Sequence, residues 1–157
     1  MGLIAGTFPA HSQENGDRIA LVIGNGDYEG MGKLANPTND AEDMGETLSI
    51  LGFDVEVVTD AGLEKMEEAV LRFRDKLAEA PESVGVFFYA GHGVQSGGEN
   101  YLIPVDARIN SESLLRARAV PLQFVLDSLK EAHNKVNIVI LDACRDNPFS
   151  WARSSSR

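Results

Sequence analysis

The sequence predicts an α/β domain built on a mostly parallel sheet that is covered by helices. From Arg18 onward, short apolar runs alternate with amphipathic stretches, which is typical of strand, helix, strand units. Three of the apolar runs are nearly continuous, as in strands that are buried on both faces. The chain has 157 residues, enough for one domain that buries about 68–70% of its unfolded surface without disulfide or metal support.

Four strands are expected, each a short run rich in branched and aromatic residues. They are Ile19–Gly24, Phe53–Val58, Val84–Ala90 and Val136–Leu141. The segment 92–120 is long and is broken by Gly97, Gly98 and Pro104. A loop of this length usually serves function or contains a short hairpin of its own.

Three helices are expected from apolar residues that recur at helical spacing. Asn39 is expected to cap the first, with Glu42 three residues later, and Gly52 to end it. Pro81 stops the second helix, and the third starts near Pro121. The expected inward stripes are Ala41, Met44, Leu48 and Leu51 in the first helix, Leu63, Met66, Val70, Phe73 and Leu77 in the second, and Leu122, Val125, Leu126 and Leu129 in the third.

The acidic excess of the chain argues against nucleic acid as a partner. The 24 acidic and 14 basic side chains give a formal net charge of −10. Residues 1–80 hold 16 acids and 6 bases, whereas residues 81–157 hold 8 of each. Nucleic-acid binding depends on clustered Lys and Arg that neutralise phosphates, and the sequence has no such cluster. No apolar run approaches the ~20 residues that cross a bilayer, so no membrane-spanning segment is expected.

Residues 1–17 are expected to form a flexible arm ahead of the domain. Met1–Gln13 is mildly apolar but lacks the basic start and the long apolar run of a signal peptide. A loose arm is favoured over the remnant of a signal peptide. A cytoplasmic location is therefore favoured over a periplasmic or secreted one.

Two of the strand ends carry residues suited to acyl transfer. The third strand ends in Tyr-Ala-Gly-His-Gly, residues 89–93, and the fourth in Asp-Ala-Cys-Arg-Asp, residues 142–146. In an open parallel sheet, the loops at the carboxyl ends of the strands line the binding crevice. If these two strands are neighbours, His92 and Cys144 leave the same edge of the sheet side by side.

Cysteine with histidine is the minimum equipment for acyl transfer. A thiol becomes a good nucleophile once it loses its proton, which an imidazole can take and later return to a leaving amine. Backbone N–H groups at Gly93 and Cys144 could hold the oxyanion of the intermediate. From the residues alone, the alternative stays open that Cys144, the single cysteine, only packs and that His92 only caps a glycine-rich turn.

These motifs resemble those of the caspase-like cysteine peptidases. Ala143-Cys144-Arg145 is similar to the caspase nucleophile motif, and His92 lies 52 residues upstream, near the spacing of about 50 in that family. Residues 89–93 match the family's histidine loop, and residues 20–25 resemble its first strand and following loop. Residues 18–149 look like the large catalytic subunit, most similar to metacaspases and their bacterial relatives, the orthocaspases. The resemblance implies a caspase fold with a Cys144/His92 dyad.

A departure from the caspase pattern points to basic substrates. Caspases that cleave after aspartate place Gln two residues before the nucleophile, where this chain has Asp142. A carboxylate there repels an acidic side chain and attracts a guanidinium, with which it can form a bidentate ion pair. In metacaspases, which cleave after Arg or Lys, this position and an acid in the first helix build the specificity pocket. By resemblance, that second acid is Asp40.

The implied activity is thus an endopeptidase that cleaves after Arg or Lys through an acyl-enzyme on Cys144. Taken singly, Asp40 is also explained as an acid in the first turn of a helix, where the dipole favours a carboxylate. Asp142 is also explained as a strand-end acid that pairs with Arg145. Together with the dyad, the specificity pocket is favoured.

The last residues bear on processing and on partners. The chain ends at Arg157, thirteen residues past Cys144, so residues 150–157 are expected to be a disordered remnant of the linker between subunits. Self-cleavage after Arg157 would leave this end, and an arbitrarily chosen boundary would look identical. A caspase fold completes its sheet with strands of a small subunit. We therefore expect an exposed sheet edge, and a cognate small subunit or second chain as partner.

No cofactor or metal is expected from the sequence. Calcium is a common activator in the family and binds oxygen ligands of several acidic residues. After His92 the chain offers Glu99 and Asp106, and no matching cluster of aspartates is found.

Two rival interpretations remain beside the peptidase. Residues 24–30 follow a strand like a dinucleotide-binding loop, but Glu29 stands where that fingerprint needs glycine. The more serious rival is a catalytically silent caspase-like scaffold or regulatory interaction domain. The presence of both His92 and Cys144 speaks against it.

Overall fold

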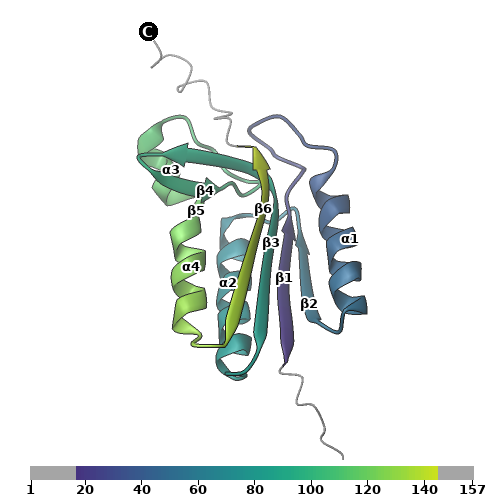
Figure 1. The fold of residues 1–157 in the computed structure, drawn as a ribbon. Coiled ribbons are helices and arrows are strands. Elements are labelled where there is room, and N and C mark those ends of the chain that lie inside the picture. The colour runs from purple at the N-terminus through teal and green to yellow at the C-terminus, as the bar shows by residue number, and fades with distance from the viewer. Residues whose placement is uncertain (1–16, 145–157) are drawn as a thin grey trace, which may run out of the picture.

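A computed structural model describes residues 17–144, with Cys144 described by its backbone alone (Figure 1). In chain order the elements are β1 (Arg18–Gly24), α1 (Pro37–Ile50), β2 (Asp54–Thr59), α2 (Leu63–Ala78), β3 (Val84–Ser96), β4 (Glu99–Leu102), α3 (Glu112–Arg118), β5 (Val120–Pro121), α4 (Leu122–Glu131) and β6 (Val136–Cys144). The expectations for the N-terminal arm up to residue 16, for Arg145 and for the tail with Arg157 lie outside the described residues.

The strands form one curled, mostly parallel sheet. Its parallel part has the order β2-β1-β3-β6, so the two strands with chemical motifs are neighbours. β3 runs on past its parallel partners and pairs antiparallel with β4 across the turn at Gly97 and Gly98, and β4 in turn pairs with β5. The long segment after His92 thus contains the hairpin that its length suggested, together with α3.

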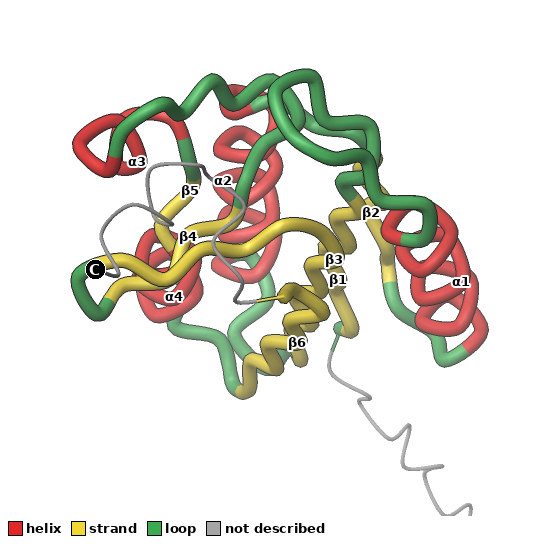
Figure 2. The backbone as a smooth tube through the Cα atoms, turned by 90° about the horizontal axis from the view of Figure 1, so that it is seen from above, coloured by secondary structure: helices red, strands yellow, loops and turns green. Residues whose placement is uncertain are grey.

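Helices cover both faces of the parallel strands, which makes three layers. Alternate residues of a strand point to opposite faces. On one face, Ala20, Val22 and Phe88 pack toward α1. On the other, a larger core that includes Leu21 and Phe87 packs toward α2 and α4. Figure 2 shows α1 on one side of the strands and α2 with α4 on the other. β1 and the parallel part of β3 are therefore buried on both faces, as their apolar runs predict.

The start of α1 differs from the prediction. The helix begins at Pro37 with Asn36 at its N-cap, so the cap predicted at Asn39 is wrong. Proline is favoured at the first helical position, because that N–H would have no partner in the helix and because the ring presets φ. The N-cap side chain makes no capping hydrogen bond, so the proline is the feature that explains the start.

Two leucines that were expected in the core are exposed. Leu51 is 54% exposed because it lies just past the end of α1, at its C-cap. Leu126 is 39% exposed because Val125 and Leu129, one turn apart, define the buried stripe of α4 and Leu126 is rotated away from it.

β6 is also more exposed than its apolar sequence predicts. Val136, Ile138 and Ile140 are 45%, 45% and 38% exposed. Val86 and Phe88, the register partners of Ile138 and Ile140 on β3, lie under α1. The helix packs on β1, β2 and β3, whereas β6 is the outermost strand of the parallel part. One face of this edge strand is therefore open, while the opposite face packs on the core through Val139 and Ala143.

No helix in residues 17–144 is long and apolar enough to cross a membrane.

Gly24 marks the closest approach of α1 to the sheet and provides a test of this packing. A Cβ at Gly24 would collide with the Pro37 carbonyl oxygen and lie 2.6 Å from the Ala41 Cβ. Because backbone cannot yield easily, Gly24→Ala should lower the free energy of unfolding by about 1–3 kcal/mol, measured by urea denaturation. Gly32→Ala is the control, since its Cβ would meet nothing within 4 Å, and it should change stability by less than about 0.5 kcal/mol. Equal losses in both variants would contradict the packing.

Candidate active site

The motif residues meet at the carboxyl edge of the parallel strands. The register of β3 and β6 pairs His92 with Cys144 and Ala90 with Asp142. Neighbouring strands lie about 4.8 Å apart, so the backbones of His92 and Cys144 are adjacent. The sequence analysis expected these two residues side by side if their strands were neighbours. β3 and β6 are neighbours, so this condition is met.

The imidazole of His92 is half-buried and is held by a backbone carbonyl. Its Nε2 lies 2.8 Å from the carbonyl oxygen of Gly32. A carbonyl oxygen only accepts hydrogen bonds, so in this contact Nε2 carries the proton. Nδ1 is then the basic nitrogen of the neutral ring.

A tyrosine that the sequence analysis did not single out packs against His92. The rings of Tyr28 and His92 have centroids 4.6 Å apart and are tilted by 55°. The backbone N–H of His92 donates to the Tyr28 hydroxyl at 2.7 Å. Burial raises the pKa of Tyr28 above its usual value and that of the neighbouring Tyr89 well above it, so both hydroxyls keep their protons at physiological pH.

The loop that carries Tyr28 and Gly32 is fixed by two side chains. Asn25 is fully buried, donates through Nδ2 to the carbonyl oxygens of Ile103 (3.1 Å) and Ala61 (3.2 Å), and accepts from the Ala61 N–H (2.9 Å). Asp60 accepts through Oδ1 from the N–H groups of residues 26 and 27, both at 2.9 Å. These two N–H groups are the ones a dinucleotide-binding loop would offer to a phosphate. Because a carboxylate already occupies them, the geometry argues against that rival.

Asp40 and Asp142 line one cavity beside His92. The cavity has a volume of about 230 Å³ and lies between the first turn of α1 and the carboxyl ends of β3 and β6. Its lining residues are Leu34, Ala35, Asn36, Pro37, Asp40, Ala90, Gly91 and Asp142. Asp40 is half-buried and Asp142 is exposed. Two acids that are far apart in the sequence thus face one opening next to the histidine loop.

The backbone N–H of Gly93 is not used by the β4 ladder. Gly93 lies opposite Leu102, and the N–H of Ile103 donates to the His92 carbonyl at 3.1 Å. This pattern makes Gly93 and Leu102 a non-hydrogen-bonded pair, whose own N–H and C=O groups point outward from the ladder. The Gly93 N–H therefore points away from β4, toward the side on which β3 pairs with β6.

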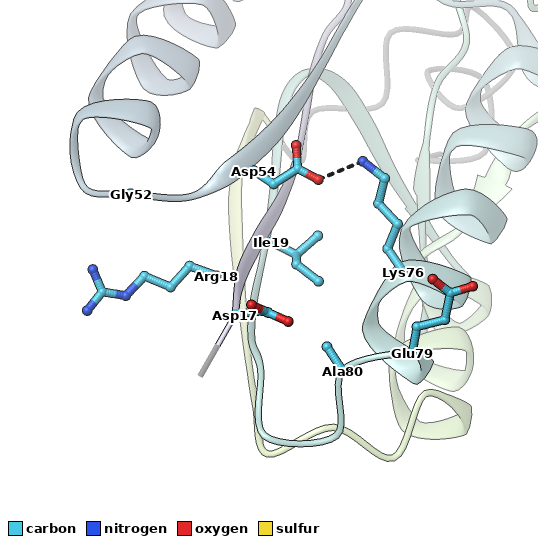
Figure 3. Close-up of a pocket in the computed structure, with 8 residues that line it drawn as sticks. All are labelled: Asp17, Arg18, Ile19, Gly52, Asp54, Lys76, Glu79 and Ala80. Atoms are coloured by element: carbon cyan, nitrogen blue, oxygen red, sulfur yellow. Dashed lines mark hydrogen bonds and ion pairs between the residues drawn. The ribbon is translucent and has the colours of Figure 1, made fainter. Parts of the chain in front are cut away.

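A larger cavity lies at the opposite end of the sheet and lacks this chemistry. It has a volume of about 770 Å³ and is lined by residues near the start of β1 and β2 and the end of α2 (Figure 3). Lys76 pairs with Asp54 at 2.9 Å, and Arg18 donates to the Leu51 carbonyl at 2.7 Å. The two basic side chains that line this cavity, Lys76 and Arg18, are thus already engaged. Within residues 17–144, no group of three or more His, Cys, Asp or Glu is placed to hold a metal ion.

A mostly parallel sheet between two layers of helices, with a histidine and a cysteine at adjacent strand ends, defines a caspase-like protein. The family model of the caspase domain matches residues 17–156, so the chain belongs to the caspase family of cysteine peptidases.

Three curated relatives extend this finding. The mucosa-associated lymphoid tissue lymphoma translocation protein 1 of Homo sapiens is 33% identical over 131 residues, which cover 82% of this chain and 15% of that protein. Its homolog in Mus musculus has the same identity and coverage. Caspase-12 of Mus musculus is 23% identical over 138 residues, which cover 88% of this chain and 32% of that protein. The chain thus spans about a third or less of the length of these relatives.

Asn25 offers a direct test of how the site is held. Asn25→Ala would leave the buried Ala61 N–H without its acceptor and would remove one of the donors to the Ala61 and Ile103 carbonyls. The free energy of unfolding should fall by about 2–4 kcal/mol, measured by urea denaturation. Asn39→Ala is the control on the exposed face of α1 and should change it by less than about 0.5 kcal/mol. An unchanged midpoint for Asn25→Ala would show that the loop is held in another way.

Proposed function

We propose that the protein is a cysteine endopeptidase of the metacaspase or orthocaspase type that cleaves after Arg, or Lys, through an acyl-enzyme on Cys144. The observation that carries the proposal is the β3–β6 register, in which His92 and Cys144 are partners at the edge where a parallel sheet binds its ligands. Membership of the caspase family supports the reaction class.

In the proposed reaction, His92 moves the protons. Nδ1 takes the proton of the Cys144 thiol, and the sulfur attacks the carbonyl carbon of the scissile peptide bond. The C–N bond then breaks, and the leaving amine receives the proton from His92. Water attacks the resulting thioester while His92 takes a proton from it. The C–S bond breaks, the acid product leaves, and the proton returns to sulfur.

The oxyanion of each tetrahedral intermediate is assigned to the N–H groups of Gly93 and Cys144. Gly93 has no side chain, so a substrate can approach its backbone closely, which supports this role. A donor that is already oriented needs no reorganisation when the charge forms, and its loss typically lowers the rate by about 10²–10³-fold.

Asp40 and Asp142 are proposed to hold the basic side chain of the substrate residue before the cleaved bond. Their common cavity lies beside Gly91 and next to His92, where such a side chain would enter. Two carboxylates approaching from α1 and from β6 can engage both edges of a planar guanidinium, whereas an ammonium is a point charge. We therefore expect Arg to be preferred over Lys.

A panel of Arg, Lys and Asp fluorogenic peptides, with and without calcium, tests this proposal in the whole protein. Arg peptides should be turned over fastest and Asp peptides least. Asp142→Ala should lower kcat/KM for Arg peptides by at least about 100-fold, because the guanidinium loses a close charge partner. Alkylation of Cys144 by iodoacetamide should stay at the parent rate, since the reagent carries no basic side chain.

Asp127→Ala is the charge-matched control, because Asp127 lies on the exposed side of α4 and does not line the cavity. If Asp142→Ala hydrolysed Arg peptides at the parent rate, the pocket assignment would be wrong. If the parent cleaved no peptide and its Cys144 reacted no faster than free cysteine, the alternative would hold, namely a catalytically silent scaffold or regulatory domain.

We further propose that the open edge of β6 receives a strand from a cognate small subunit or a second chain. The exposed row of Val136, Ile138 and Ile140 supports this, because an apolar edge strand invites pairing. Self-cleavage after Arg157, which lies outside the described residues, would separate such a subunit and is part of the same proposal.

Ile138→Lys should weaken that association at least tenfold, because it places a charge in the middle of the apolar row. Analytical ultracentrifugation of the whole protein measures it. Val57→Lys is the matched control, since Val57 is comparably exposed on β2, at the other edge of the parallel strands. An unchanged association in Ile138→Lys would remove β6 as the docking edge.

A further inference from the structure

Two buried tyrosine hydroxyls converge on the backbone of His92. The His92 N–H donates to the Tyr28 hydroxyl oxygen at 2.7 Å. The Tyr89 hydroxyl lies 2.8 Å from the His92 carbonyl oxygen, and the two hydroxyl oxygens are 3.3 Å apart. Tyr89 is fully buried and Tyr28 almost so. Both polar groups of the His92 backbone are therefore engaged by side chains from two different segments.

The directions of these bonds follow from the donors available. The Tyr28 oxygen accepts from His92, so its own proton is free to point at the Tyr89 oxygen. Tyr89 has one proton and two carbonyl oxygens within reach, that of His92 at 2.8 Å and that of Ile103 at 3.1 Å, and it donates to the nearer one. The result is a closed ring of three hydrogen bonds, from the His92 N–H to Tyr28, to Tyr89 and back to the His92 carbonyl. Because burial raises both tyrosine pKa values, neither hydroxyl loses its proton near neutral pH.

Gly91 and Ile103 complete this arrangement. Gly91 has φ +154°, and a Cβ there would lie 2.6 Å from the Tyr28 hydroxyl and 2.7 Å from the Tyr89 hydroxyl. The missing side chain leaves the space in which the hydroxyls meet. The N–H of Ile103 is shared between the His92 carbonyl (3.1 Å) and the Tyr89 hydroxyl (3.2 Å), which ties the ring to the chain beyond β4.

We propose that Tyr28 and Tyr89 are positioning residues for His92. Their ring of hydrogen bonds fixes the backbone at the point where β3 leaves its parallel partners, while the Tyr28 ring packs against the imidazole. The imidazole is thereby held between the Tyr28 ring and the Gly32 carbonyl, with Nδ1 left to serve Cys144. The inference rests on the proposed peptidase function, because it assigns a role in proton transfer that matters only if His92 serves Cys144.

Tyr28→Phe is the variant that isolates the hydroxyl. It keeps the aromatic ring against His92 but removes the acceptor of the His92 N–H and the donor to Tyr89. Tyr101→Phe is the matched control, because Tyr101 is buried to the same extent, with 2% exposed in both, and its hydroxyl donates to Glu99 at 2.8 Å and not to the His92 network.

The first measurement is the pH dependence of Cys144 alkylation by iodoacetamide in the whole protein. In the parent, His92 should make the thiol react at a pH below the midpoint of about 8.5 for free cysteine. In Tyr28→Phe the pH midpoint should move toward that of free cysteine, and kcat for Arg peptides should fall at least about tenfold with KM within about twofold. Tyr101→Phe should match the parent in both.

The second measurement is amide hydrogen exchange at His92, which does not depend on catalysis. The His92 N–H should exchange at least about tenfold faster in Tyr28→Phe than in the parent and in Tyr101→Phe, because it loses its acceptor. Equal exchange in all three proteins would overturn the hydrogen-bond ring.

The outcomes separate this inference from the proposed function. A parent that reacts like a free thiol refutes the peptidase and, with it, the positioning role. A reactive parent whose alkylation profile and kcat are unchanged by Tyr28→Phe refutes the positioning role alone.

Discussion

The parallel pairing of β3 with β6 is the constraint on which the rest of the site depends. Nine residue pairs run from Val84 and Val136 at one end to His92 and Cys144 at the other. A slip of one residue would turn every side chain of β6 to the opposite face of the sheet. The register is fixed far from the site. There the Asn137 side chain occupies the space left by the missing Cβ of Gly85 and donates through Nδ2 to the side-chain oxygen Oδ1 of Asn134 at 2.8 Å. Packing at the start of the two strands thus sets the chemistry at their ends.

The second constraint is the loop between β1 and α1, which brings polar groups to the strand edge without a strand of its own. Asn25 ties its start to the segments after β2 and β4, and Asp60 holds its N–H groups. From this fixed base the loop presents the ring of Tyr28 and the carbonyl of Gly32 to His92. The histidine is therefore positioned from two sides, by its own strand and by a loop that begins more than sixty residues earlier.

Much of this could be predicted from the sequence, and the failures have physical reasons. The strand cores were predictable because continuous apolar runs in β1 and β3 reflect burial on both faces. β6 has the same kind of sequence, but its position at the edge leaves Ile138 exposed, and composition cannot distinguish the two cases. The cap predicted at Asn39 was wrong because Pro37, whose ring presets φ for the first helical position, starts α1 with Asn36 as its N-cap. Asp40 and Asp142 could be named from a motif resemblance, and their common cavity became visible only with the fold. Tyr28 was missed because a tyrosine in a glycine-rich loop has no pattern that links it to a histidine sixty-four residues away.

The most direct test of the account is covalent labelling of Cys144 by an arginyl fluoromethylketone, mapped by mass spectrometry of the whole protein and of its His92→Ala variant. The account predicts that the parent is labelled at Cys144, much faster than by the aspartyl analogue of the reagent, and that His92→Ala loses most of this rate. Labelling at the rate of free cysteine, equal for both reagents and indifferent to His92, would contradict it.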